Sequence, residues 1–413
     1  MQEKNVTEIL SELVKIKSIS SDKNHIADVK KSAEFVEKLF LELGLQTKIA
    51  TSGNSRPAVL AQTEINPDRK TVLLYAHHDV QPVGDINKWE TDPFNPEIIN
   101  GRLFGRGSGD NKAGVVIHHE VVKELMKDLP VNIKIFIEGE EEIGSPCMAQ
   151  FLDEFNKEHE ADVIVIADSG NIRIGTPTVT TSLRGLVDGF IEVDQPMRPV
   201  HSGVGGGVVP DAFMVLSKII ASFHNEKGEL QIEGLTSSDM DVLELKEEEI
   251  KKIFGSEDIN LFELDSISKR LWLEPALSIL AIDAPSTKEA VNLVIPNAKA
   301  KVSLRLPPTE DPEHAMKMLE EHIMKNVPWG ANVRFIPEAK GSGIVADPNK
   351  EFTKKLVQNF EEVFNTDAAY MGVGGSIPFA NDFVEKFPNA ELVLIGAADE
   401  EMGNAHAPNE SVQ

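Results

Sequence analysis

Short apolar runs of strand length alternate with longer amphipathic segments in the first part of this chain. The strand-like runs are residues 71–76, 132–138 and 162–167, and the helical segments between them are residues 114–126 and 145–158. Parallel strands need a crossover connection, and that connection is usually a helix. The alternation therefore predicts an α/β domain with a mostly parallel sheet.

The character of the chain changes midway and then returns. A length of 413 residues is too great for one ordinary hydrophobic core, so at least two domains are expected. Residues 182–338 combine strands, helices and an acidic stretch in the manner of an α+β unit, and the first pattern resumes after residue 338. We predict a discontinuous α/β domain formed by residues 1–181 and 339–413, with residues 182–338 inserted as a smaller α+β domain. Within the insertion, the acidic residues 225–270 are expected to be mobile or helical.

Composition excludes several classes of partner and site. The formal net charge is −26, from 41 basic and 67 acidic residues, which argues against nucleic acid and anionic membranes as partners. The single cysteine, Cys147, excludes a disulfide framework and a cysteine-based zinc finger, so a metal site must use His, Asp and Glu. We see no signal peptide and no apolar run of about 18 residues, and we expect a cytoplasmic enzyme.

Side chains that can bind metal follow several of the predicted strands. In open α/β sheets, ligands bind beyond the carboxyl ends of the strands. The side chains at these positions are His77 and Asp79, the run Glu140-Glu141-Glu142, Asp168 and His406, and a glycine-rich loop adds Asp110. Their coincidence is a stronger signal than any one motif.

Two histidines and three carboxylates suit a pair of zinc ions. One carboxylate can bridge ions ~3.5–4 Å apart, with a water between them as nucleophile. A further carboxylate is needed as general base, and the three consecutive glutamates offer a spare. For His77 alone, a strand end with surface histidines is the alternative. His77 and Asp79 alternate along an extended backbone and so share a face, whereas His78 points to the other and is expected to be structural.

Four motifs resemble the co-catalytic di-zinc metallopeptidase family that includes cytosolic non-specific dipeptidase, carnosinase, carboxypeptidase G, aminoacylase and succinyl-diaminopimelate desuccinylase. They are Tyr75-Ala-His-His-Asp-Val-Gln-Pro82, Gly105-Arg-Gly-Ser-Gly-Asp-Asn-Lys112, Glu138-Gly-Glu-Glu-Glu-Ile-Gly-Ser145 and Gly374-Gly-Ser-Ile-Pro378. The resemblance covers nearly the whole chain and is closest to the dipeptidase branch. It implies a catalytic α/β domain, an inserted lid and dimerisation domain, two Zn²⁺ per subunit and a homodimer.

The resemblance also implies a ligand for each metal position. His77 and Asp168 would hold one zinc ion, Glu142 and His406 would hold the other, and Asp110 would bridge both. Histidine and carboxylate ligands also suit Mn²⁺ or Co²⁺, and the family resemblance is what favours zinc.

Two further carboxylates would support the reaction. Asp79 would fix the ring of His77 as its outer partner. Glu141 would be the general base that deprotonates the bridging water and returns the proton to the leaving amine.

Four residues would bind the substrate. His201 matches the family histidine that reaches the active site of a neighbouring subunit and stabilises the oxyanion. Arg305 matches the arginine that clamps the free carboxylate of the substrate, a task that suits a planar fork. Gly375 and Ser376 match a loop that contacts the same carboxylate.

Some features depart from the family pattern or have no assigned role. Asn111 stands where many relatives have a second aspartate, and we expect it to tune loop geometry. The residues after His406 look like the start of a helix. The remaining histidines are expected to pack in a helix or face solvent (His118 and His119) or to lie at the surface (His25, His159, His224, His314 and His322).

The implied function is zinc-dependent hydrolysis of dipeptides that carry a free C-terminal carboxylate. An N-acyl-amino-acid deacylase or a carboxypeptidase on the same scaffold is the first alternative, and the pocket around the first residue of the substrate separates these activities. A non-catalytic binding paralogue is the second alternative. Such a protein would be expected to lose ligands or the base, whereas all five ligands and Glu141 are present.

Overall fold

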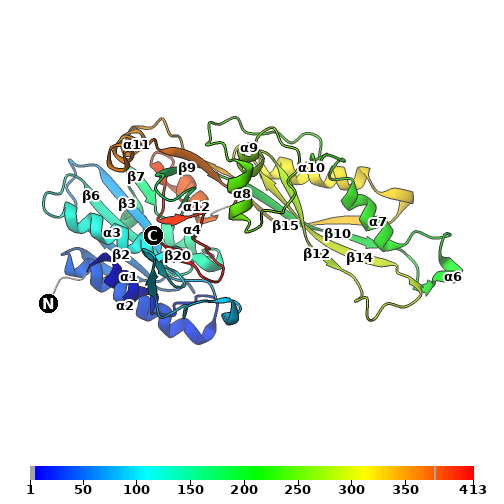
Figure 1. Cartoon of the computed structure of the whole chain (residues 1–413), viewed down its shortest axis with the longest axis horizontal. Coiled ribbons are helices and arrows are strands. Elements are labelled where there is room, and N and C mark those ends of the chain that lie inside the picture. The colour runs from blue at the N-terminus through cyan, green and yellow to red at the C-terminus, as the bar shows by residue number, and fades with distance from the viewer. Residues whose placement is uncertain (1–4, 376–377) are drawn as a thin grey trace.

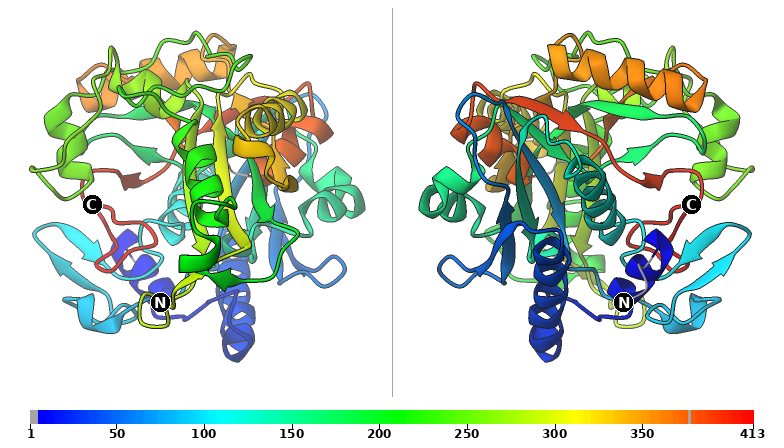
Figure 2. Two further views of the ribbon diagram at one scale, coloured as in Figure 1. Left: turned by 90° about the vertical axis from the view of Figure 1, so that its right-hand side faces the viewer. Right: turned by 90° about the vertical axis from the view of Figure 1, so that its left-hand side faces the viewer.

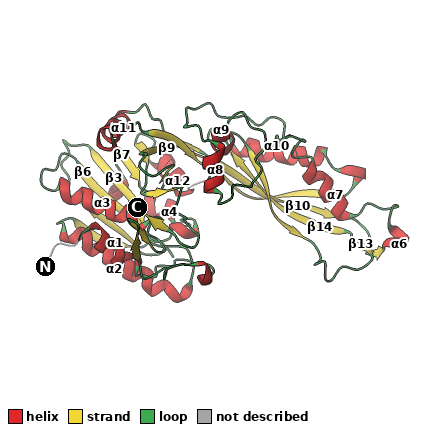
Figure 3. Ribbon diagram, viewed as in Figure 1, coloured by secondary structure: helices red, strands yellow, loops and turns green. Residues whose placement is uncertain are grey.

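The computed structural model describes residues 5–375 and 378–413. The molecule is elongated and has two lobes, each built around its own sheet (Figure 1). Figure 3 shows the strands of both sheets with helices packed beside them. In the end-on views of Figure 2, one lobe lies in front of the other. Both chain termini belong to the larger lobe.

The larger lobe contains a nine-stranded sheet with the order β1-β2-β6-β3-β7-β18-β9-β16, in which β17 also pairs with β9. Its strands are β1 (Gln46–Ala50), β2 (Ala58–Gln62), β3 (Thr71–His77), β6 (Asn132–Glu138), β7 (Val163–Ile166), β9 (Thr178–Leu183), β16 (Ile344–Val345), β17 (Ala369–Val373) and β18 (Glu391–Leu394). The neighbours β6, β3, β7 and β18 run parallel to one another. Antiparallel pairs lie on either side of this parallel centre.

Helices cover both faces of this sheet, which confirms the expected α/β class. One face packs against α1 (Val6–Val14), α2 (Ile26–Glu42), α3 (Lys112–Leu125) and α11 (Glu351–Phe364), and the other against α4 (Met148–Glu154), α5 (Asn156–His159) and α12 (Pro378–Lys386). Central strands are apolar on both sides for this reason, and every residue of β6 is buried. The single helix expected over residues 145–158 is divided into α4 and α5 at Phe155.

The smaller lobe is an antiparallel sheet with helices on one face. Its strands are β12 (Ala276–Asp283), β14 (Asn297–Leu306), β10 (Gly185–Asp194) and β15 (Val333–Gly341), in that order. Buried residues alternate with partly exposed ones along β10, so only one side of the sheet faces the apolar core with α7 (Ala212–Ala221) and α10 (Pro312–Lys325). This is the expected α+β unit. We refer to it as the lid lobe.

The chain passes between the lobes at two points. β9 ends in the large sheet at Leu183 and β10 begins in the small one at Gly185. On return, β15 ends at Gly341 and β16 begins at Ile344. The acidic stretch 225–270 includes α8 (Glu247–Ile253) and α9 (Ile267–Trp272), which pack against β17 in an apolar cluster that contains Trp272 and Met371. This part of the insertion therefore contains two short helices, and most of its remaining residues lie outside helices and strands.

The residues after His406 form a strand and not the helix suggested by the sequence. β20 (Ser411–Val412) pairs with β5 (Arg102–Phe104), which pairs with β4 (Glu97–Ile99). The remaining short elements are η1 (Lys23–His25), η2 (Ile86–Lys88), η3 (Glu141–Ile143), β8 (Gly170–Asn171), β11 (Val200–His201), α6 (Ser202–Gly205), β13 (Leu293–Val294), η4 (Pro328–Gly330) and β19 (Ala398–Asp399). Within residues 5–375 and 378–413, every helix is too short or too polar to cross a membrane.

Candidate metal centre

The carboxyl ends of the four central parallel strands deliver the candidate ligands to one edge of the large sheet. His77 is the last residue of β3, and Asp168 follows β7. Glu142 lies on the one-turn helix η3 directly after β6, and His406 lies in the long loop after β18. Asp110 comes from the loop before α3. Parallel strands end at the same edge of a sheet, so residues distant in sequence meet there.

Asp110 lies between two histidines and contacts each with a different carboxylate oxygen. Its Oδ1 lies 3.0 Å from Nε2 of His77, and its Oδ2 lies 3.0 Å from Nε2 of His406. Oδ1 of Asp168 is 3.3 Å from Nε2 of His77, and Oε2 of Glu142 is 3.0 Å from Nε2 of His406. Two groups of possible metal ligands result, namely His77–Asp110–Asp168 and Asp110–Glu142–His406.

The chemistry of these two groups fits divalent cations. Each group offers one imidazole nitrogen and two carboxylates with ligand atoms within 4.8 Å of one another, a donor set that zinc, manganese and cobalt accept. Burial and neighbouring carboxylates, including Asp110, raise the pKa values of Glu142 and Asp168. A cation would offset the repulsion between these carboxylates.

The two histidines respond to the same negative charge. Burial lowers the pKa of His77, but Asp168 and Asp110 outweigh that effect and raise it well above its ordinary value. Hydrogen bonds to Asp110 and Glu142 raise the pKa of His406 to about 10. Burial of Asp110 opposes its ionisation, yet its bonds to both histidines lower its pKa. The site is therefore strongly negative and attracts positive charge.

Asp79 connects the end of β3 to the turn after β6. Nδ1 of His77 lies 3.1 Å from the backbone oxygen of Asp79 and 3.3 Å from its carboxylate. The two carboxylate oxygens also accept the backbone N–H groups of Glu141 at 3.2 Å and Glu142 at 3.1 Å. Asp79 is fully buried, so it fixes both the ring and the turn that carries two of the candidate residues.

Glu141 lies beside both ligand groups and belongs to neither. Its Oε2 is 3.9 Å from Nε2 of His77, and its side chain is 18% exposed. Burial and the charge of Asp168 raise its pKa well above the ordinary value. A raised pKa strengthens a carboxylate as a base.

Two of the candidate ligands are held by neighbouring amide side chains whose role the sequence did not predict. Asn111 donates to the carboxylate of Asp168 at 2.8 Å and to the backbone oxygen of Ala167, which fixes the direction of Asp168. Gln81 donates its backbone N–H to the carboxylate of Glu142 at 3.1 Å and its side-chain amide to the backbone oxygen of Glu142 at 2.9 Å. Gln81 stands within the quoted motif around His77, which is the signal that could have identified it.

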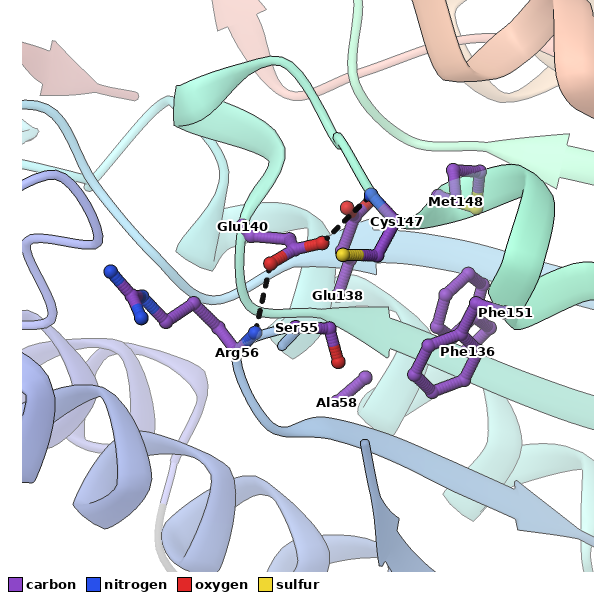
Figure 4. A pocket seen from close by; sticks show the side chains of 9 residues that line it. All are labelled: Ser55, Arg56, Ala58, Phe136, Glu138, Glu140, Cys147, Met148 and Phe151. Carbon is purple, nitrogen blue, oxygen red and sulfur yellow. Dashed lines mark hydrogen bonds between the residues drawn. The ribbon is translucent and has the colours of Figure 1, made fainter. Parts of the chain in front are cut away.

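Glu140 points away from the ligand groups. Its carboxylate accepts the backbone N–H of Arg56 at 2.8 Å and of Cys147 at 3.2 Å, as the dashed lines in Figure 4 show. Figure 4 also shows that the side chains around it line a separate small pocket whose far side is aromatic. Glu140 therefore holds the backbone on either side of the turn.

The other histidines serve the fold. His78 is buried on the opposite side from His77, where its Nε2 lies 2.9 Å from the backbone oxygen of Pro57, as expected of a structural residue. The expectation of surface positions was wrong for His159 and His322. His159 is fully buried among aromatic rings, and His322 is buried and stacks on Phe223. Spacing along the chain does not reveal these tertiary contacts.

The candidate substrate residues lie apart from the ligand groups. His201 is exposed beside α6, at the end of the lid lobe farthest from the large sheet (Figure 1). Arg305 is half-buried on β14, where its backbone oxygen accepts from Arg184 at 3.4 Å. Gly375 follows β17 and is half-buried, and Ser376 lies outside the described residues. Arg184 also donates its backbone N–H to the backbone oxygen of Val373, so this one arginine contacts both β14 and the end of β17.

Comparisons with known proteins agree with this architecture. A cysteinylglycine-S-conjugate dipeptidase from Corynebacterium striatum is 31% identical over 412 residues, covering 98% of this chain and 90% of that protein. The crystal structure of human carnosine dipeptidase 1 matches with a TM-score of 0.80 and 25% identity over 98% of this chain and 91% of that one. An M20-family metallo-carboxypeptidase from Sulfolobus solfataricus matches with a TM-score of 0.78 and 27% identity over 99% and 95% of the respective chains. Residues 73–413 match the model of peptidase family M20/M25/M40, and the chain belongs to this family.

Proposed function

We propose that this chain is a dipeptidase that uses two zinc ions, with Mn²⁺ or Co²⁺ as substitutes. The observation that carries the proposal is Asp110, whose two oxygens each lie 3.0 Å from a different histidine. His77 and Asp168 would hold one ion, Glu142 and His406 the other, and Asp110 both. Bound ions would supply polarisation of the scissile carbonyl and greater acidity of a nearby water.

Glu141 would move the proton. It would take a proton from the attacking water as the oxygen bonds to the carbonyl carbon of the substrate. It would then give that proton to the leaving amine nitrogen as the C–N bond breaks, so the base is restored. Its raised pKa and its position outside both ligand groups support this role.

Arg305, Gly375 and Ser376 would bind the C-terminal carboxylate of the substrate. The positive charge between the lobes supports this role. Burial lowers the pKa of Arg184 to about 10; the charges of Arg305 and Arg270 add to this effect and Glu274 opposes it, so arginines outnumber acidic groups around Arg184 and leave a local excess of positive charge. A carboxylate beside the Arg305 guanidinium would offset that excess and could form two parallel hydrogen bonds with it.

The working unit would be a homodimer formed through the lid lobe, with His201 completing the site of the partner. β12 is an edge strand of the lid sheet, so one row of its backbone groups is available for pairing. Large apolar side chains are exposed on this lobe, namely Val204, Val208, Met214, Leu280, Ile282 and Val291. The distant position of His201 from the ligand groups of its own chain supports action across subunits.

We also propose that the protein is cytoplasmic and has no nucleic-acid or membrane partners. The formal net charge of −26 disfavours polyanionic surfaces. The single cysteine is consistent with a compartment in which disulfides are rare.

A carboxypeptidase acting on longer peptides is the second candidate, and the similarity to the Sulfolobus metallo-carboxypeptidase favours it. A hydrolysis screen of the zinc-loaded protein separates the two. It compares unblocked dipeptides, β-alanyl dipeptides, tripeptides, N-acetyl and N-succinyl amino acids, and C-terminally amidated dipeptides as matched controls. We expect the highest kcat/KM for unblocked dipeptides and a large loss on amidation. Preference for longer peptides would support a carboxypeptidase, and preference for N-acyl substrates would support a deacylase.

A further inference from the structure

A buried arginine–glutamate pair joins the two loops that carry Asp110 and His406. Nη1 of Arg106 lies 2.6 Å from Oε2 of Glu410, and each side chain is only 1% exposed. Arg106 belongs to the glycine-rich loop before α3, and Glu410 belongs to the segment that leads into β20. Neither residue is part of a ligand group.

Each member of the pair also binds the backbone of the opposite loop, next to a candidate ligand. Nη2 of Arg106 donates to the backbone oxygen of His406 at 3.1 Å. Oε1 of Glu410 accepts the backbone N–H groups of Gly109 at 3.0 Å and Asp110 at 3.1 Å. The contacts are reciprocal, so the pair fixes the two loops relative to each other where Asp110 meets His406.

The ring of His406 contacts Asp110 and Glu142, but the backbone that carries it needs support from elsewhere. Its side chain is 57% exposed, and its loop lies outside the helices and strands. Its backbone has a φ of 62°, in the left-handed region that non-glycine residues rarely occupy. A residue persists there only when surrounding contacts hold it, and the bond from Arg106 to its carbonyl is such a contact.

We propose that Arg106 and Glu410 are positioning residues that set the geometry of the Asp110–Glu142–His406 group. This inference rests on the proposed two-metal function. Loss of the pair would let the His406 loop move relative to Asp110 while the large sheet stays intact. The ion held by His406 and Glu142 would then bind more weakly than the ion held by His77 and Asp168.

A neighbouring ion pair provides a matched control. Nη2 of Arg102 lies 2.8 Å from Oδ2 of Asp399, and both side chains are almost as deeply buried, at 6% and 5% exposed. This pair also holds the C-terminal segment, because Arg102 donates to the hydroxyl of Ser411 at 3.0 Å. Its hydrogen bonds involve neither Asp110 nor His406.

The test compares Arg106→Met/Glu410→Gln with Arg102→Met/Asp399→Asn in the full chain. Each double substitution removes both charges and so avoids leaving one buried charge unpaired. In the Glu410→Gln side chain, the amide oxygen would still accept from Gly109 and Asp110, so the main loss is the donor to His406. Zinc titration against a competing chelator gives the number and affinity of bound ions, and the visible spectrum after Co²⁺ loading reports ligand geometry. Circular dichroism of the metal-free chains checks that each variant is folded.

We expect the wild-type chain and the Arg102 control to bind two ions with similar affinities. The Arg106 variant should bind one of the two about 10- to 100-fold more weakly, with an altered Co²⁺ spectrum. Two ions bound as in wild type, or an equal loss in the control, would overturn the inference. If the double variant does not fold, Arg106→Lys replaces it in the test, because an ammonium keeps the charge but lacks the guanidinium fork that reaches both Glu410 and His406. Two ions bound by Arg106→Lys with wild-type affinities would contradict the inference. A wild-type chain that binds fewer than two ions would overturn the proposed function as well.

Discussion

The carboxylate of Asp79 accepts the backbone N–H of Glu142 at 3.1 Å. The same carboxylate lies 3.3 Å from the ring of His77, so one buried side chain joins a candidate ligand on β3 to a candidate ligand after β6. This relationship makes the orientation of the site depend on a residue outside both ligand groups. It also allows the role of Asp79 to be separated from that of the ligands.

Replacement of Asp79 by asparagine should weaken metal binding and lower kcat/KM, each by about 10- to 100-fold. The amide keeps one acceptor for the turn after β6 but loses the charge that orients His77. Zinc titration and dipeptide hydrolysis measure the two effects. Asp162→Asn is the matched control, because Asp162 accepts the backbone N–H of Thr71 at 2.8 Å at the opposite end of the same strand. Similar losses in both variants would assign Asp79 a general structural role.

Mixing two inactive variants tests the role of His201 across subunits. Homodimers of His201→Ala and of Glu141→Ala should each have little activity, because every site lacks one group. Random exchange makes half of the dimers mixed, and each mixed dimer has one complete site, so about a quarter of wild-type activity should return. Differently tagged subunits confirm the exchange. Confirmed exchange without recovered activity would contradict action across subunits.

Protonation of His159 should contribute to acid unfolding. Burial among aromatic rings lowers the pKa of His159 to about 4, against an ordinary value of 6.5. The unfolded chain therefore binds the extra proton first, and the stability contributed by neutral His159 is complete above about pH 6.5 and declines as the pH falls toward 4. At pH 4.5 the loss is about 2 to 3 kcal/mol.

His159→Phe should remove this part of the pH dependence. Urea unfolding of the metal-free chain at pH 7.5 and at pH 4.5 measures the change in the free energy of unfolding. Metal-free protein is used because protons would otherwise compete with metal ions for the ligands at the lower pH. The wild-type chain, measured at the same two pH values, is the reference. If the free energy of unfolding of His159→Phe falls between pH 7.5 and pH 4.5 by as much as that of the wild-type chain, protonation of His159 does not contribute to acid unfolding.

The sequence allowed prediction of the parallel centre of the sheet and of the five side chains that meet at its edge. Strands β3, β6, β7 and β18 are apolar runs of clear length, and parallel strands bring their carboxyl ends together. Among the strands of the two large sheets, it did not predict β9, β12, β16 or β17. Hydrogen-bonded pairing with a neighbouring strand, such as that of β12 with β14 and of β17 with β9, favours the extended conformation there more than the local hydrophobic pattern does.

Other parts of the site depend on contacts between distant segments. Glu140 precedes η3, and its carboxylate binds the backbone of Arg56 and Cys147, whereas Glu141 and Glu142 lie on η3 itself. The Arg106–Glu410 pair forms only when the C-terminal segment docks beside β5. Neither feature follows from the local periodicity of the chain.

We propose different tasks for two adjacent glutamates, namely proton transfer for Glu141 and metal binding for Glu142. Metal content measured together with kcat, for Glu141→Gln and Glu142→Gln, tests this assignment most directly. Glu141→Gln should retain close to two ions per chain and lose about 10²- to 10⁴-fold in kcat, as expected on removal of a general base. Glu142→Gln should lose one ion. Loss of an ion from Glu141→Gln, or turnover close to wild type in that variant, would contradict the account.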